Sequence, residues 1–229
     1  MPSDVGPVYC ETGHPWLFVA EPVNSVTNLA ILIAAIFGLR ALLRAPRPWP
    51  LDVIAMVAVL FGCAVGSFLW HTFRTRMFLT LDVVPGLLFL FIFIYAWIRR
   101  LASPTIALAG LGGLVTAMTV MMRSIRHAAA AGTMTRTPLM FVPVFGLILA
   151  GGILLVALTR KRFGWPLARA SLMVVTAAAL AALFRTIDLE TCAVLPMGTH
   201  FLWHFGLSTA AYLGIRLALR LDTVRASSN

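Results

Sequence analysis

Four ionisable side chains stand near the ends of apolar segments and together could perform chemistry. His71, His200 and His204 offer imidazole nitrogens, and Asp82 offers a carboxylate. Three histidines that leave one coordination position open are the ligand set of a catalytic zinc site. Zinc lowers the pKa of a bound water to about 7, and a nearby carboxylate can accept a proton from that water or orient it. These residue types point to metal-assisted hydrolysis.

The spacing of these residues favours a shared site. His200 and His204 are four residues apart, so on a helix they share one face and could bind one metal ion. Ser67 and His71 have the same separation. Simpler alternatives stay open: interfacial histidines bonded to carbonyl groups or water, Asp82 capping a helix start, and Ser67 bonded to a carbonyl one turn earlier.

Composition determines which elements must position these residues. Of the 229 residues, 60% are hydrophobic and 11% are charged, whereas soluble domains have about 45–50% and about 25%. The mean hydropathy is +0.93. Seven spans of about 20 residues need about 140 apolar positions, which this composition supplies. The sequence excludes a soluble enzyme, a disordered chain and a coiled coil, and its long apolar runs disfavour a transmembrane barrel.

We predict an all-α fold, an integral membrane bundle of seven transmembrane helices that forms a single domain over residues 1–229. Each apolar segment is long enough to cross a hydrocarbon core of about 30 Å. Segment 1–21 has acidic residues and no early apolar core, so we expect it to be retained and exposed. The predicted spans are 22–43, 51–72, 79–98, 105–122, 138–159, 166–185 and 198–219.

The basic residues predict how the bundle is oriented. With the N-terminus outside, the inner segments carry twelve of the 18 Lys and Arg residues. Inner loops are enriched in Lys and Arg, so we expect the N-terminus outside and the C-terminus inside. The second span then ends, and the third and seventh begin, at the outer side, where all the candidate residues gather. The net charge of +10 belongs to these loops, and no basic groove with interleaved aromatic residues indicates nucleic-acid binding.

Five short segments carry a family pattern. They are AEPVNSVTNL at 20–29, GSFLWHT at 66–72, LDVVP at 81–85, ID at 187–188 followed by Cys192, and GTHFLWH at 198–204. Together they resemble the alkaline ceramidases, within the wider superfamily of seven-span hydrolases that includes the adiponectin-receptor-like proteins. The middle of the chain, from about residue 100 to 180, matches only in its hydropathy.

The resemblance implies a zinc ion on His71, His200 and His204, with Asp82 as the base beside a zinc-bound water. It implies that Ser67 lies near the metal and contacts the water or the developing oxyanion. The implied reaction is hydrolysis of the ceramide amide to a sphingoid base and a fatty acid, and we expect such a substrate to enter from the bilayer. The alternatives are a related hydrolase of another acyl lipid, a heptahelical receptor or binding protein whose structural zinc Asp82 completes, and no metal at all.

One departure from the family concerns calcium. Glu11 and Glu21 match two positions of a calcium site that eukaryotic members carry. Val8 and Gly13 stand where further oxygen-bearing side chains are expected. Two carboxylates are few for an ion that takes 6–8 oxygen ligands, so the sequence disfavours calcium here.

The remaining expectations concern the loops and the host membrane. The resemblance implies a disulfide between Cys10 and Cys192 in an oxidising compartment. We expect Cys63 to be an inert core thiol, and Asp188 to support the loop before the last span or to orient a ligand histidine. The use of 17 Arg to one Lys suits a bacterial inner membrane. Nothing in the sequence indicates an oligomeric state.

Overall fold

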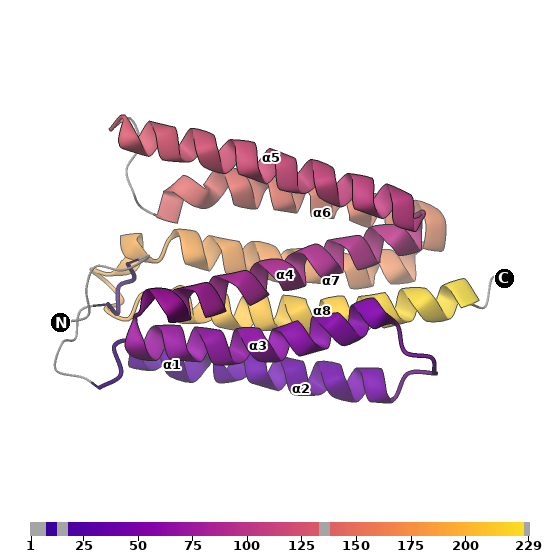
Figure 1. Ribbon diagram of the computed structural model, residues 1–229, viewed down its shortest axis with the longest axis horizontal. Helices are drawn as coiled ribbons and strands as arrows, with labels where there is room; N and C mark the ends of the chain where they lie inside the picture. The colour runs from indigo at the N-terminus through magenta and orange to yellow at the C-terminus, as the bar shows by residue number, and fades with distance from the viewer. Residues whose placement is uncertain (1–7, 13–17, 133–137, 227–229) are drawn as a thin grey trace.

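The computed structural model describes residues 8–12, 18–132 and 138–226, and every regular element in them is helical (Figure 1). The all-α prediction is therefore confirmed for the described residues. Gly13, one of the positions compared with the calcium site, lies outside them. The elements are α1 (Pro22–Thr27), α2 (Leu29–Leu43), α3 (Leu51–Phe73), α4 (Arg76–Leu101), α5 (Pro104–Ala130), η1 (Pro138–Phe141), α6 (Val142–Phe163), α7 (Trp165–Thr186), η2 (Leu189–Thr191) and α8 (His200–Ala226).

Within the described residues, six helical segments are long and apolar enough to cross a membrane, which indicates a multi-pass membrane protein. They are the joined α1 and α2, Pro22–Leu43, and each helix from α3 to α7. The fourth is longer than predicted, because α5 continues past its apolar run to Ala130. Helix α8 has 27 residues but is less apolar, since Arg216, Arg220 and Asp222 lie within it. The count of seven spans stays a prediction.

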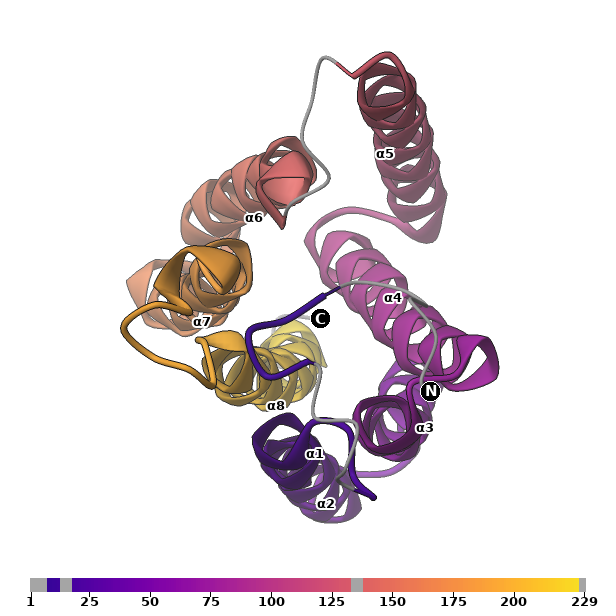
Figure 2. The ribbon, with the colours of Figure 1, turned by 90° about the vertical axis from the view of Figure 1, so that its left-hand side faces the viewer.

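The helices lie side by side along one long axis, so α3 ends at the same end of the bundle where α4 and α8 begin (Figure 1). Viewed from that end, α8 has α7 on one side and the joined α1 and α2 on the other (Figure 2). Helix α8 also packs against α4 and α3. The topology therefore brings the end of α3 and the starts of α4 and α8 together, as the spacing of the candidate residues requires.

A glycine allows the closest approach between α3 and α4. A Cβ atom on Gly66 would lie 1.9 Å from the carbonyl oxygen of Leu81 and 2.9 Å from the backbone nitrogen of Asp82. No side chain fits at that distance from a backbone, so residue 66 must be glycine for the two helices to pack as they do. Because Ser67 follows Gly66, this contact also sets the position of Ser67 relative to Asp82.

A partly buried charge cluster joins three helices at the opposite end of the bundle. Asp52 at the start of α3 binds Arg99 and Arg100 of α4, at N–O distances of 2.7 and 2.6 Å. Arg100 is fully buried and also reaches Asp222 of α8 at 2.5 Å. Paired and hydrogen-bonded charges are the form in which charge is tolerated inside a bundle. The cluster ties α8 to α3 and α4 at the end away from the histidines.

The N-terminal segment differs from the exposed segment that the sequence predicts, as far as its described residues go. Tyr9 and Glu11 are buried, and the Cys10 side chain is partly covered. The expectation is wrong for these residues because three attachments hold them to the bundle. They are a disulfide from Cys10 to Cys192, hydrogen bonds from Glu11 to the first turn of α1, and packing of the Tyr9 ring on His200.

Candidate metal centre

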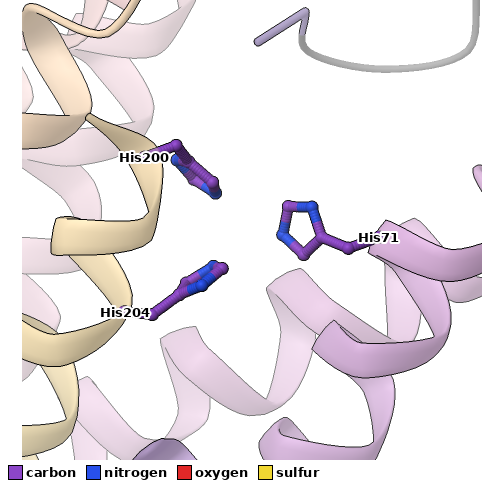
Figure 3. A group of neighbouring side chains, drawn as sticks. All are labelled: His71, His200 and His204. Carbon is purple, nitrogen blue, oxygen red and sulfur yellow. The ribbon is translucent and has the colours of Figure 1, made fainter. Parts of the chain in front are cut away.

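Three imidazole rings converge at the end of the bundle where α3 ends and α8 begins. His71 lies in the last turn of α3, and His200 and His204 lie in the first two turns of α8, facing it (Figure 3). One ligand nitrogen from each ring lies within 4.8 Å of the other two, and all three side chains are buried. Tetrahedral zinc with Zn–N bonds of about 2.0–2.1 Å needs nitrogens about 3.4 Å apart. Small rotations of the side chains would bring the rings to that spacing.

The hydrogen bonds of His204 decide which of its nitrogens is available. The Thr27 hydroxyl donates to the carbonyl oxygens of Val23 and Asn24, so its single proton is already engaged. The His204 Nδ1 atom lies 2.8 Å from the Thr27 Oγ1 atom and must therefore be the donor. The Nε2 atom is then unprotonated. It is also buried and has no hydrogen-bond partner among the described residues, as a metal ligand requires.

The other two rings are compatible with the same ion. The His71 Nδ1 atom lies 2.5 Å from the Glu21 Oε2 atom, so the carboxylate accepts its proton and leaves Nε2 available. The Nδ1 atom of His200 is buried and, within the described part of the chain, has no hydrogen-bond partner. Buried polar atoms without partners are rare in folded proteins, so the three-histidine donor set fits a zinc ion.

Several hydrogen-bond donors surround the Glu21 carboxylate. It is fully buried, and besides His71 it accepts from Thr12 and Asn24 and contacts Arg74 at 3.0 Å. Burial raises the pKa of the Glu21 carboxyl from its ordinary value, and the Arg74 guanidinium opposes that rise. Carboxylate–histidine pairs of this kind fix the tautomer and orientation of a metal-ligating ring. Glu21 therefore belongs to the histidine centre.

The two glutamates do not fit a calcium ion. Each Glu11 oxygen accepts a backbone N–H of the first turn of α1, from Val23 at 2.6 Å and from Asn24 at 2.8 Å. Each Glu21 oxygen likewise meets a donor. Calcium requires several oxygen ligands that are free to face the ion. Within the described residues these four oxygens face N–H and O–H groups, so Glu11 caps a helix and Glu21 supports His71.

Ser67 and Asp82 form a pair beside the histidines. The buried Ser67 hydroxyl lies close enough to the partly exposed Asp82 carboxylate to stabilise its charge. Ser67 lies one turn before His71 on the same face of α3, so the pair adjoins the converging rings. The arrangement places a carboxylate, a hydroxyl and three imidazoles at one end of the bundle. Such a set can bind a metal, accept a proton and stabilise a developing negative charge.

Asp188 fixes the start of α8. Its Oδ1 atom accepts the backbone N–H groups of Thr199 and His200, each at 2.8 Å, and its Oδ2 atom accepts that of Cys10 at 3.2 Å. Gly198 has a φ of +66°, and a Cβ atom there would lie 2.2 Å from Asp188 Oδ1. Cys10 and Cys192 are joined by a disulfide. Asp188 thus supports the loop before α8 and positions the backbone of His200.

Tyr9, Arg74 and Arg185 also lie at this centre, although the sequence analysis assigned them no chemical role. The Tyr9 ring lies 4.0 Å from the His200 ring and 5.3 Å from the His71 ring, centroid to centroid. The Arg74 and Arg185 guanidinium carbons lie 5.4 and 4.7 Å from the Tyr9 centroid. Burial raises the pKa of Tyr9 to about 12, an effect that the Arg185 charge opposes, so the phenol is neutral at neutral pH.

The sequence signal for these residues was weak. In the sequence, Arg74 and Arg185 belong to the basic residues of the outer segments, but both are buried. Only the position of Tyr9 beside a cysteine of the expected disulfide hinted that it would be near the site. For Thr27, the hint was a hydroxyl residue inside an otherwise apolar span.

A family model described as Ceramidase matches residues 8–229, which is nearly the whole chain. No curated protein matches the chain. The family match covers α1, α3, α4 and α8, which carry the converging side chains, and also the middle helices, where the resemblance was one of hydropathy alone.

Proposed function

The chain belongs to the ceramidase family, and from this we propose that it is a zinc-dependent amide hydrolase acting within the membrane on ceramide-like lipids. Family membership supports a hydrolase of the ceramidase type. The observation that carries the finer proposal is the convergence of three buried histidines, two of which have a buried ring nitrogen without a hydrogen-bond partner in the described chain. The products would be a sphingoid base and a fatty acid.

His71, His200 and His204 would hold the zinc ion, which when bound supplies a Lewis acid that acidifies water and polarises a carbonyl oxygen. Among the described residues, no fourth His, Cys, Asp or Glu joins this group. Structural zinc sites are usually closed by four protein ligands, whereas catalytic sites have three and keep one position open. The donor count therefore favours a catalytic role over a receptor with a structural zinc.

Asp82 acts as the general base. It accepts a proton from the attacking water as the water oxygen adds to the amide carbon. When the C–N bond breaks, the same proton passes to the nitrogen, so the amine leaves neutral and the acyl group leaves as the acid. The Ser67 hydroxyl lies beside the Asp82 carboxylate, where it can orient the carboxylate by a hydrogen bond or turn toward the oxygen on which negative charge develops.

We also propose that the histidine end of the bundle faces outward, with α8 as a seventh span. The Cys10–Cys192 disulfide lies at that end, and disulfides persist in oxidising compartments. The basic run Arg160–Arg162 lies at the other end, as inner loops require. The composition suits a bacterial inner membrane. A lipid substrate would reach the centre from the bilayer, since its chains are apolar and the histidines are buried in the bundle.

The test is a lipid panel with product analysis. Purified, zinc-loaded protein in lipid nanodiscs is incubated with ceramides, N-acylethanolamines and acyl esters, and the products are identified by mass spectrometry. The proposal expects a sphingoid base and a fatty acid from ceramide. Cleavage of another acyl lipid with ceramide left intact would keep the chemistry and replace the substrate. Zinc-loaded protein that cleaves no lipid would refute the hydrolase assignment.

A further inference from the structure

Among the described residues, one buried cation in the centre forms no ion pair within 4.0 Å. Arg185, in the last turn of α7, is 8% exposed, and its Nη1 atom has no hydrogen-bond partner within the described residues. Its neighbour Arg74 differs, because that guanidinium contacts Glu21 at 3.0 Å. In the described chain, the ion pairs within 4.0 Å join other residues and leave Arg185 out. The Glu21 and Asp82 carboxylates interact with this charge only at longer range. A buried charge without a directly bonded partner is costly, so its retention calls for a ligand.

Arg185 and the candidate zinc ligand His200 both contact the Tyr9 ring. Its guanidinium carbon lies 4.7 Å from the centroid of the Tyr9 ring, and the same ring lies 4.0 Å from the His200 ring. Tyr9 offers Arg185 the face of a neutral ring, which attracts a cation weakly and does not neutralise it. An anion bound by Arg185 would therefore be separated from the candidate zinc ligand His200 by no more than the Tyr9 ring.

Hydrolysis of an amide creates such an anion where none existed. The substrate amide is neutral, and the acid that is released ionises to a carboxylate at neutral pH. Arginine presents a planar fork of N–H donors that matches a carboxylate in a two-point contact, and the contact is stronger where water is excluded. We propose that Arg185 binds the carboxylate of the released fatty acid. This inference rests on the proposed function, because that reaction would generate the acid at this position.

The experiment measures binding without turnover. Carboxyl-labelled laurate is titrated into the full-length, zinc-loaded protein in nanodiscs, with dodecanol as the uncharged probe of equal chain length. In the R185Q variant we expect laurate to bind about ten- to a hundredfold more weakly, as loss of a charged hydrogen bond implies, while dodecanol binding stays within twofold. The R76Q variant, which alters an exposed arginine at the same end of the bundle, is the matched control and should bind both probes as the parent does.

If Arg185 had only a general structural role, its replacement would not affect laurate more than dodecanol. Equal weakening of laurate and dodecanol in R185Q, or no weakening of laurate, would overturn the assignment. If R185Q does not fold, R185K preserves the charge and the stem but loses the planar fork. The assignment then requires a several-fold loss for laurate alone, and unchanged laurate binding in R185K would overturn it.

A second comparison separates the product carboxylate from an anionic head group. The KM values of ceramide and of ceramide phosphate are measured for the parent and for R185Q. A rise in KM confined to the phosphorylated lipid, with laurate binding retained, would assign Arg185 to head-group recognition and overturn the product assignment. An inactive chain whose laurate binding depends on Arg185 would refute the hydrolase proposal alone. An active chain in which R185Q binds laurate normally would refute this inference alone.

Discussion

The Nδ1 atom of His71 lies 2.5 Å from the Oε2 atom of Glu21, which directly precedes α1. This contact joins the start of the first span to a candidate zinc ligand at the end of α3. The Thr27–His204 hydrogen bond makes the equivalent connection from α1 to α8. A helix of six residues therefore supports ligands on two other helices, and the two contacts set which nitrogen of each ring faces the centre.

Removing the charge of Glu21 should weaken zinc binding. In E21Q the amide can no longer accept the His71 Nδ1 proton as a carboxylate does, and loss of such an outer contact typically costs 10- to 100-fold in metal affinity. Zinc affinity is measured by competition with a chromogenic chelator. The matched control is E190Q, at an exposed glutamate near the same end. Equal zinc affinity in E21Q and E190Q would contradict the function assigned to Glu21.

Thr27 should be replaceable by serine and not by valine. T27V has nearly the same shape but no acceptor for the His204 Nδ1 proton, so the ring is free to turn or change tautomer. We expect zinc affinity to fall about tenfold or more in T27V and to recover in T27S. Both variants are measured by the same chelator competition. Matching affinities for T27V and T27S would show that this hydrogen bond does not orient the ring.

Asp82 should be required for turnover and dispensable for the metal. D82N preserves the size of the side chain but cannot accept the proton from water, and loss of a general base typically lowers the rate about 10²- to 10⁴-fold. Ceramide turnover and zinc content are measured on the same preparation. We expect zinc to be retained while turnover falls. Parental turnover in D82N would remove Asp82 from the mechanism, and loss of zinc would make it a ligand.

Gly66 should be intolerant of a methyl group. In G66A the new Cβ atom would meet the Leu81 carbonyl oxygen at 1.9 Å, a backbone atom that cannot move aside without shifting α4. We expect a destabilisation of about 3 kcal/mol, at the upper end of typical overpacking costs. Gly62, one turn earlier on α3, has open space within 4 Å of its Cβ position and provides the control G62A. Thermal unfolding in detergent compares the two, and similar melting temperatures would contradict this packing.

Much of the site was accessible from the sequence because it depends on helical spacing. The i, i+4 pair His200 and His204, together with the alternating direction of the spans, is enough to place the three histidines at one end of the bundle. What spacing does not reveal is which donors surround a carboxylate. The sequence therefore connects Glu21 only with a calcium site that it disfavours, whereas the Glu21 oxygens bind His71, Arg74 and their neighbours.

Burial of charged side chains was the second feature that could not be predicted from the sequence. Arg185 follows an apolar run and has the appearance of a loop charge, yet it packs on Tyr9, a residue 176 positions away that the disulfide of the adjacent Cys10 brings close. The low hydropathy of α8 has a similar explanation. Two of its polar residues have partners on other helices, the Thr27 hydroxyl for His204 and Arg100 for Asp222, and a hydropathy profile does not reveal these contacts.

The most direct test of the account is the zinc content of the purified protein and of the H200A/H204A double variant, measured by mass spectrometry of the metal and by zinc X-ray absorption. We predict about one zinc per chain in the parent, in a coordination shell with three imidazole nitrogens and one further light atom, and loss of that zinc in the variant. A folded, metal-replete parent without zinc, or a variant that keeps it, would contradict the assignment of His71, His200 and His204 as its ligands.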